Sequence, residues 1–116
     1  MGDVMSKIVD GHPWSVGFGS PDSAQRGEDA ALMSDLPKDK QKHVEDWILD
    51  NIEPIKTPNR KHSSYHIKHI LERDIGIYLT NNQFKDAMMN MGYSPVNVSD
   101  LNWYFCISER SHAFNR

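Results

Sequence analysis

The sequence predicts a small α+β domain of three helices and a two-stranded antiparallel sheet, arranged like a winged helix-turn-helix, behind a disordered N-terminal leader. Three observations support this prediction. Five of the seven glycines lie in the first 35 residues, which show no sustained apolar period. From Leu36 onward, three amphipathic helical patterns with capping residues follow one another. The chain then enters an aromatic, β-prone run at Asn102–Ile107.

These patterns divide the 116 residues into a flexible leader (1–35), a small α+β domain (36–110) and a frayed polar tail (111–116). The leader is dominated by Gly, Ser, Asp and Pro. Such a stretch buries too little apolar area to offset a backbone entropy of about 1–2 kcal/mol per residue, so we expect it to be disordered. A core drawn from roughly 80 residues is small, which disfavours a deep catalytic pocket and favours a surface-binding role.

The first helix is expected between Pro37 and Pro54. Ser34 or Asp35 can cap it, and proline suits the first helical turn because its missing N–H costs little there. Its apolar stripe consists of Val44, Trp47, Ile48 and Ile52. Pro54 ends the helix because proline cannot donate the next backbone hydrogen bond.

A linker from Ile55 to His62 leads to the second helix. Ser63 or Ser64 can cap this helix, which runs to about Asp74. Its apolar positions at helical spacing are Ile67, Ile70 and Leu71. Gly76 can end it, because glycine adopts the left-handed conformation of a helix C-terminus without strain.

The third helix begins at Thr80 or Asn81, either of which can cap it. Its apolar stripe consists of Phe84, Ala87, Met88 and Met91. Gly92 follows at the position where helices commonly stop.

The two strands are expected before and after the third helix. We expect Ile77–Leu79, in a short β-prone run, to pair with Trp103–Ile107. The expected core comprises Val44, Trp47, Ile48, Ile52, Ile67, Ile70, Leu71, Leu79, Phe84, Ala87, Met88, Met91, Trp103 and Phe105.

Charge is distributed unevenly along the chain. Residues 1–53 contain 5 basic and 11 acidic residues, a net of −6, whereas residues 54–116 contain 8 basic and 5 acidic residues, a net of +3. Charge asymmetry between halves is typical of proteins with a nucleic-acid or membrane partner. Ordinary solvated faces are the alternative explanation.

The densest basic stretch predicts a nucleic-acid interface. Lys56, Arg60, Lys61 and Lys68 suit phosphate groups. The third helix would face outward with Asn81, Asn82, Gln83 and Lys85, side chains that can read base edges in a major groove. This hypothesis requires the linker before Ser63 to lie alongside the start of the third helix. The alternative is that any exposed helix carries amides and lysines.

Other chemistry finds little support. His62, His66 and His69 have a spacing that zinc accepts, but no cysteine lies nearby, so we expect surface histidines and no metal or cofactor. Cys106 stands among aromatic residues, which indicates burial rather than a nucleophile. No catalytic motif is found, so we expect no enzymatic activity. The single cysteine fits a reducing cytoplasm, and no stretch is apolar enough for a membrane span.

The segment between Ser63 and Ser108 contains a series of short motifs. They are Ser64-Tyr65, Lys68-His69, Gly76-Ile77-Tyr78-Leu79-Thr80-Asn81, Gln83-Phe84, Ala87-Met88, Gly92-Tyr93 and Asn102-Trp103-Tyr104-Phe105. Through them, 46 of the 116 residues resemble a small uncharacterised domain family of bacterial phages, plasmids and integrated elements. The resemblance implies a mobile-element setting and a helix-turn-helix-like fold, and it transfers no activity. Family members often have glycine after Tyr65, where this chain has His66.

We therefore expect a cytoplasmic, non-enzymatic binding module that contacts nucleic acid through the basic linker and the third helix. The alternative is an adaptor that binds a protein partner through the acidic first helix, or through the leader with Trp14 and Phe18. No membrane partner is expected.

Overall fold

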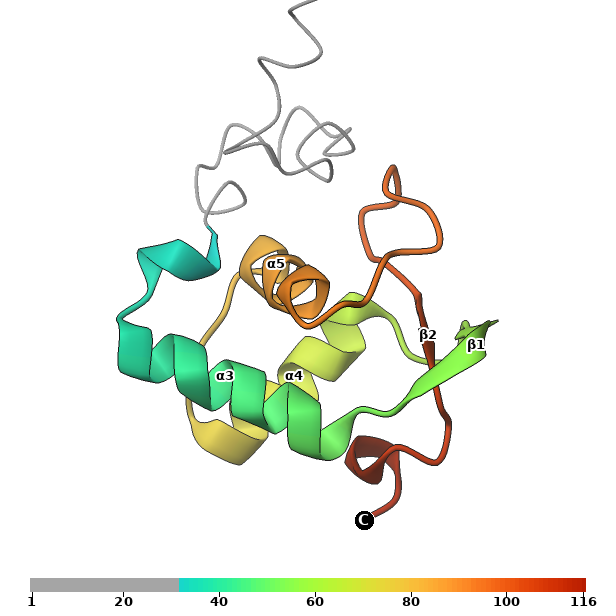
Figure 1. Ribbon diagram of the computed structural model, residues 1–116, viewed down its shortest axis with the longest axis horizontal. Coiled ribbons are helices and arrows are strands. Elements are labelled where there is room, and N and C mark those ends of the chain that lie inside the picture. Colours follow the sequence, from blue (N-terminus) through green and yellow to red (C-terminus); the bar gives the residue numbers. More distant parts are fainter. Residues whose placement is uncertain (1–31) are drawn as a thin grey trace, which may run out of the picture.

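The computed structural model describes residues 32–116 and confirms an α+β fold with three α-helices and a two-stranded antiparallel sheet. The elements in chain order are the 3₁₀ helix η4 (Met33–Asp35), α3 (Lys38–Asn51), β1 (Pro54–Asn59), α4 (Ser64–Ile75), α5 (Asn81–Asn90), β2 (Phe105–Ile107) and the 3₁₀ helix η5 (His112–Phe114). Figure 1 shows the three α-helices packed together with the sheet on one side of them. Nearly all of the predicted leader, residues 1–31, lies outside the described residues.

The helix boundaries follow from local hydrogen bonds. Ser63 caps α4 by accepting a hydrogen bond from the His66 N–H, and Gly76 closes it with a left-handed φ of 71°. At the start of α5, Thr80 and Gln83 form a reciprocal capping box, with both hydrogen bonds at 3.0 Å. The N-cap of α3 is Pro37, because Ser34 and Asp35 are part of η4 instead.

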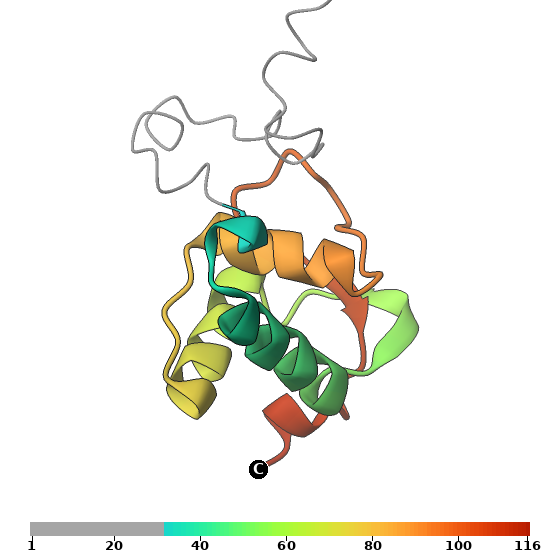
Figure 2. The same cartoon turned by 60° about the vertical axis from the view of Figure 1, so that its left-hand side comes forward.

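Helix α5 packs against several other elements, and most of its side chains are buried. It contacts α3, α4 and η4, and Figure 2 shows it lying across the other two α-helices. Every side chain from Asn82 to Met88 is buried. The predicted core is confirmed except at Met91, which is only partly buried.

The first strand was predicted in the wrong place. β1 is formed by Pro54–Asn59, inside the expected linker, and its register with β2 is irregular, with Pro54 opposite Ile107 and Asn59 opposite Phe105. β1 thus contributes more residues than β2, which makes it bulge outward. Its two prolines, which lack a backbone donor, suggested a loop; they are tolerated because this is an edge strand.

Residues Ile77–Leu79 form an extended connector instead of a strand. The Leu79 N–H donates to Glu72 Oε2 at 2.9 Å, so this backbone donor is bonded to a side chain rather than to a neighbouring strand. Ile77 and Leu79 are buried, whereas Tyr78 is exposed. The alternation of buried and exposed side chains therefore belongs to a connector whose every second residue packs into the core.

The folded domain extends beyond both predicted boundaries. Before residue 36, Leu32 and Met33 are buried, and the Met33 N–H donates to Asp86 Oδ2 at 2.8 Å. Beyond residue 110, Ser111 is buried and its Oγ accepts from the Glu53 N–H at 2.8 Å. The tail is therefore packed rather than frayed, because Ser111 bonds to the backbone between α3 and β1 and Ala113 is buried in the core. Within residues 32–116, no helix is both long and apolar enough to cross a membrane.

Candidate nucleic-acid interface

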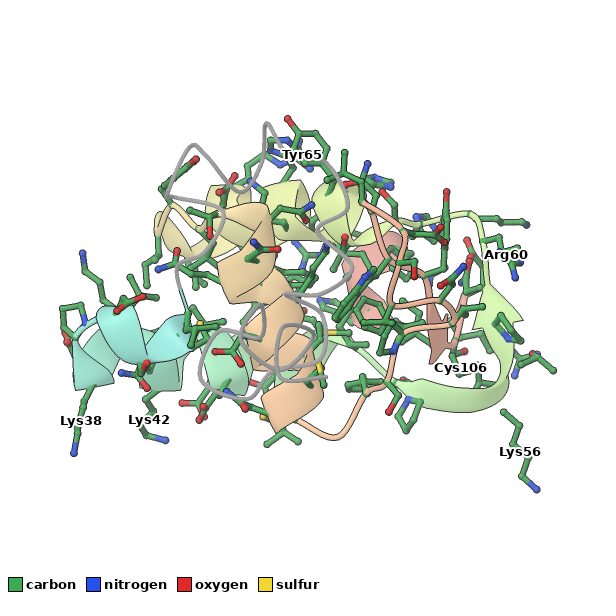
Figure 3. The ribbon with its side chains drawn as sticks, turned by 90° about the horizontal axis from the view of Figure 1, so that it is seen from above. Lys38, Lys42, Lys56, Arg60, Tyr65 and Cys106 are labelled. Atoms are coloured by element: carbon green, nitrogen blue, oxygen red, sulfur yellow. The ribbon has the colours of Figure 1, made fainter. Side chains whose placement is uncertain are left out.

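Three exposed cations lie on β1 and the linker that follows it. Lys56, Arg60 and Lys61 are exposed, and within residues 32–116 none of them forms an ion pair. Figure 3 shows Lys56 and Arg60 at the opposite end of the domain from Lys38 and Lys42 of α3. This end therefore presents three cations without an ion pair to a described carboxylate, although the Glu109 carboxylate lies close to Lys61.

The same segment borders an open groove of about 250 Å³. Its lining residues are Ile55, Thr57, Pro58, Asn59, Arg60, Lys61, Ile107 and Glu109. The Asn59 side chain fixes the turn by accepting the Lys61 N–H at 2.9 Å. The Arg60 guanidinium lies 5.8 Å from the centre of the Tyr104 ring, a cation–π contact that orients it without neutralising it. Two cations thus share one groove with the Glu109 carboxylate.

The expectation that α5 presents base-reading side chains is wrong. Asn82, Gln83 and Lys85 are 1%, 7% and 1% exposed, respectively. The Gln83 amide is occupied by Thr80 and by the Leu32 carbonyl, which it reaches at 3.3 Å. The Lys85 ammonium lies 4.8 Å from the centre of the Trp103 ring. Since α3, α4 and η4 all pack on α5, its polar residues are internal and cannot enter a groove of DNA.

Lys68 is also unavailable to phosphate. It is 4% exposed, and its ammonium donates to Glu72 Oε2 at 3.0 Å. The rings of Tyr65 and Tyr78 flank the same ammonium at 5.2 and 5.3 Å. Its charge is thus neutralised within the fold, although the side chain belongs to the basic stretch of the sequence.

The side-chain amide of Asn81 is used structurally. Its Oδ1 accepts from Ser64 Oγ at 3.2 Å, and its Nδ2 donates to the Leu101 carbonyl at 3.1 Å. The starts of α4 and α5 are therefore adjacent, but the contact is made by Ser64 of α4, whereas the hypothesis concerned the linker before Ser63. The contact joins the two helices. The Asn81 amide already has hydrogen-bond partners within the fold, so it is not available to a nucleic-acid base.

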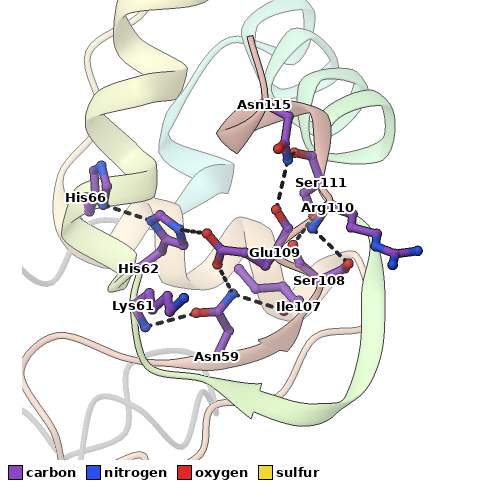
Figure 4. A network of polar contacts seen from close by, with 10 residues as sticks. All are labelled: Asn59, Lys61, His62, His66, Ile107, Ser108, Glu109, Arg110, Ser111 and Asn115. Carbon is purple, nitrogen blue, oxygen red and sulfur yellow. Dashed lines mark hydrogen bonds and ion pairs between the residues drawn. The ribbon is translucent and has the colours of Figure 1, made fainter.

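His62 forms a fixed cluster at the junction of three segments (Figure 4). Its Nδ1 lies 3.2 Å from His66 Nδ1, and its Nε2 lies 3.1 Å from Glu109 Oε2. The ring stacks on Phe114, with centroids 3.6 Å apart and an interplanar angle of 5°. Glu109 also accepts from Asn59 Nδ2 at 2.9 Å. The cluster thus ties the end of β1 to the start of α4 and to the C-terminal segment.

The cluster perturbs two of its own titratable groups. Partial burial and the nearby His62, His69 and Arg73 lower the pKa of His66, since each disfavours the imidazolium form. Hydrogen bonds from Asn59 and His62 lower the pKa of Glu109. At neutral pH, His66 is therefore uncharged and Glu109 is ionised.

Of the three histidines whose spacing zinc accepts, the structure brings only His62 and His66 into direct contact. His69 points elsewhere, with Nδ1 3.3 Å from Glu72 Oε1 and its ring edge-on to Tyr65. Glu109 and Phe114 were missed, because nothing in their spacing connects them with His62. In the described part of the chain, no group of three or more His, Cys, Asp or Glu side chains is arranged to hold a metal ion.

Comparisons with known proteins add no assignment: the chain matches no protein-family model, no curated protein and no solved structure. The resemblance to a mobile-element family therefore stays a prediction from the sequence motifs.

Proposed function

We propose that the protein is a cytoplasmic, non-enzymatic binding module of a mobile element that contacts the phosphate backbone of nucleic acid. The interface consists of Lys56, Arg60 and Lys61 on β1 and its linker. The observation that carries the proposal is that these exposed cations form no ion pair within the described residues. The mobile-element setting is carried over from the sequence resemblance alone.

The geometry favours phosphate contacts over base reading. Lys and Arg that neutralise phosphates gain affinity by releasing condensed counterions, whatever the sequence. β1 bulges from the domain and can follow a backbone, whereas α5 is buried. We therefore expect duplex DNA to be bound with little sequence preference.

A double substitution tests this function. Arg60→Ala with Lys61→Ala removes the two cations that share the groove, and we expect at least a tenfold loss of affinity for a fluorescein-labelled DNA duplex in low salt. The readout is fluorescence anisotropy on the full chain. Neither side chain is buried, so the fold should be kept, and circular dichroism verifies this.

The matched control removes the same charge from the other end of the domain. Lys38 and Lys42 are exposed residues of α3, and Lys42 pairs with Asp46. Lys38→Ala with Lys42→Ala should change the affinity by less than about twofold, because surface charges far from the interface contribute little. Equal losses of DNA affinity in the two double variants would mean that only the overall charge of the protein matters. This result would contradict a localised interface.

A protein-binding adaptor is the second candidate, because one apolar side chain stands out on the acidic helix. Leu49 of α3 is 69% exposed and close in sequence to Asp46 and Asp50. The same helix contributes Trp47 to a pocket of about 400 Å³ that also includes Ile75. A photo-crosslinking residue in place of Leu49 tests this function. A specific adduct that disappears in Asp46→Lys with Asp50→Lys, together with no DNA binding, would favour the adaptor.

A further inference from the structure

We propose that His62 and His66 form a binding site for one divalent transition-metal ion of the zinc type. The proposal does not depend on nucleic-acid binding. It rests on the approach of the two Nδ1 atoms to 3.2 Å (Figure 4). Without a metal, one ring donates its Nδ1–H to the Nδ1 lone pair of the other; once that proton is lost or moves to Nε2, the two Nδ1 lone pairs can share one metal ion.

The spacing suits two ligands of one ion. Zinc binds imidazole nitrogen at about 2.0–2.1 Å in tetrahedral geometry, which places adjacent ligand atoms about 3.3 Å apart. The observed Nδ1–Nδ1 distance of 3.2 Å is close to this value. The two rings are tilted by 40° with centroids 5.0 Å apart, so neither ring stacks over the other and covers the space between the nitrogens.

The surroundings of His62 prepare its Nδ1 for this role. Glu109 Oε2 lies 3.1 Å from Nε2, so the Nε2–H is donated to the carboxylate and the lone pair remains on Nδ1. A carboxylate in this position is a common partner of metal-binding histidine, because it fixes the tautomer and raises the basicity of the ring. Asn59 holds Glu109, and Phe114 holds the ring.

The described residues supply two ligands and no third. The remaining coordination positions would be taken by water, since His66 lies on the surface. Such a site binds metal more weakly than the closed four-ligand sites that stabilise small domains. We therefore expect reversible loading and a fold that persists without the ion.

Isothermal titration of the full chain with Zn²⁺ at pH 7.5, in a buffer that does not bind metal, tests the site. We expect one equivalent to bind, with at least a tenfold loss of affinity in His66→Ala. Glu109→Gln should weaken binding by about tenfold, because the hydrogen-bond partner of a metal-binding histidine typically contributes that much. In NMR spectra, the ring signals of His62 and His66 should shift on addition of Zn²⁺ and those of His43 should not.

His69→Ala is the matched control, since His69 is a surface residue of the same helix that contacts Glu72 rather than the pair. It should leave the Zn²⁺ affinity within twofold of the wild type. His62→Ala could disturb packing on Phe114, so the test relies on His66→Ala, at an exposed residue. Absence of binding at millimolar Zn²⁺, or an affinity that His66→Ala leaves unchanged, would overturn the proposal.

Discussion

Arg60 and Lys68 belong to the same basic stretch of the sequence, yet the fold uses them differently. Lys68 is buried against Glu72 and two tyrosine rings, whereas Arg60 is exposed on the ring of Tyr104 with no described ion pair. Removing a cation that is paired inside the fold leaves its buried partner uncompensated and destabilises the protein, whereas an unpaired exposed cation is available to a ligand. Their substitutions should therefore have opposite consequences.

Lys68→Met should reduce stability and spare DNA binding. The substitution keeps most of the aliphatic stem but leaves the partly buried Glu72 carboxylate without its ammonium partner, which should cost about 1–3 kcal/mol. Urea unfolding measures the stability, and anisotropy on the folded variant measures the DNA affinity, which we expect to stay within twofold. A folded Lys68→Met variant that loses DNA binding would show that Lys68 contacts the ligand.

Gly76→Ala tests the left-handed backbone conformation at the end of α4. Nothing lies within 4 Å of a Cβ built at Gly76, so the substitution creates no clash, but φ is +71° there. An alanine in the left-handed region costs roughly 1–2 kcal/mol, and we expect urea unfolding to show about that loss. Gly76→Asn, which tolerates this conformation better, should lose less. Equal stability of Gly76→Ala and the wild type would mean that α4 ends differently.

At the scale of the elements, the helices could be predicted and the first strand could not. The caps at Ser63 and Thr80 are local, so sequence neighbours alone reveal them. β1 depends on a partner far along the chain and contains two prolines, which hide it in the sequence. The burial of α5 was missed for the same reason: its polar residues find partners in η4, a segment that the sequence assigns to the leader.

Thr80→Ala tests the capping box that starts α5. The substitution removes the acceptor of the Gln83 N–H, and we expect a loss of about 1 kcal/mol in the free energy of unfolding. Thr80→Ser keeps the hydroxyl and should recover most of this loss. If both variants unfold at the same urea concentration, the hydroxyl does not contribute as described.

At the scale of the whole molecule, both ends of the described chain are bound to the helices. Near the C-terminus, Arg116 donates to Asp74 Oδ1 at 2.7 Å, and Trp47 Nε1 donates to Asp74 Oδ2 at 2.7 Å. Asp74 therefore joins the tail to α3 and α4. Each of these contacts joins residues that are far apart in the sequence, so no local sequence pattern predicts them.

Asp74 should make stability depend on acid pH. The hydrogen bond from Arg116 is the main cause of its lowered pKa, so the folded state favours the ionised carboxylate. The resulting stability is fully present above the ordinary pKa of about 3.9 and is lost as pH falls through the lower folded value. Asp74→Asn should therefore be less stable than the wild type at pH 7, and the difference should shrink toward pH 3. A difference that stays constant between pH 7 and pH 3 would exclude this linkage.

The dependence of duplex-DNA affinity on salt tests the central claim most directly. If Lys56, Arg60 and Lys61 each neutralise one phosphate, the logarithm of the association constant should fall with the logarithm of salt concentration with a slope of about −2.7, and of about −0.9 in the Arg60→Ala, Lys61→Ala variant. The same slope in both proteins, or no binding by the wild type at low salt, would contradict an interface on β1 and its linker.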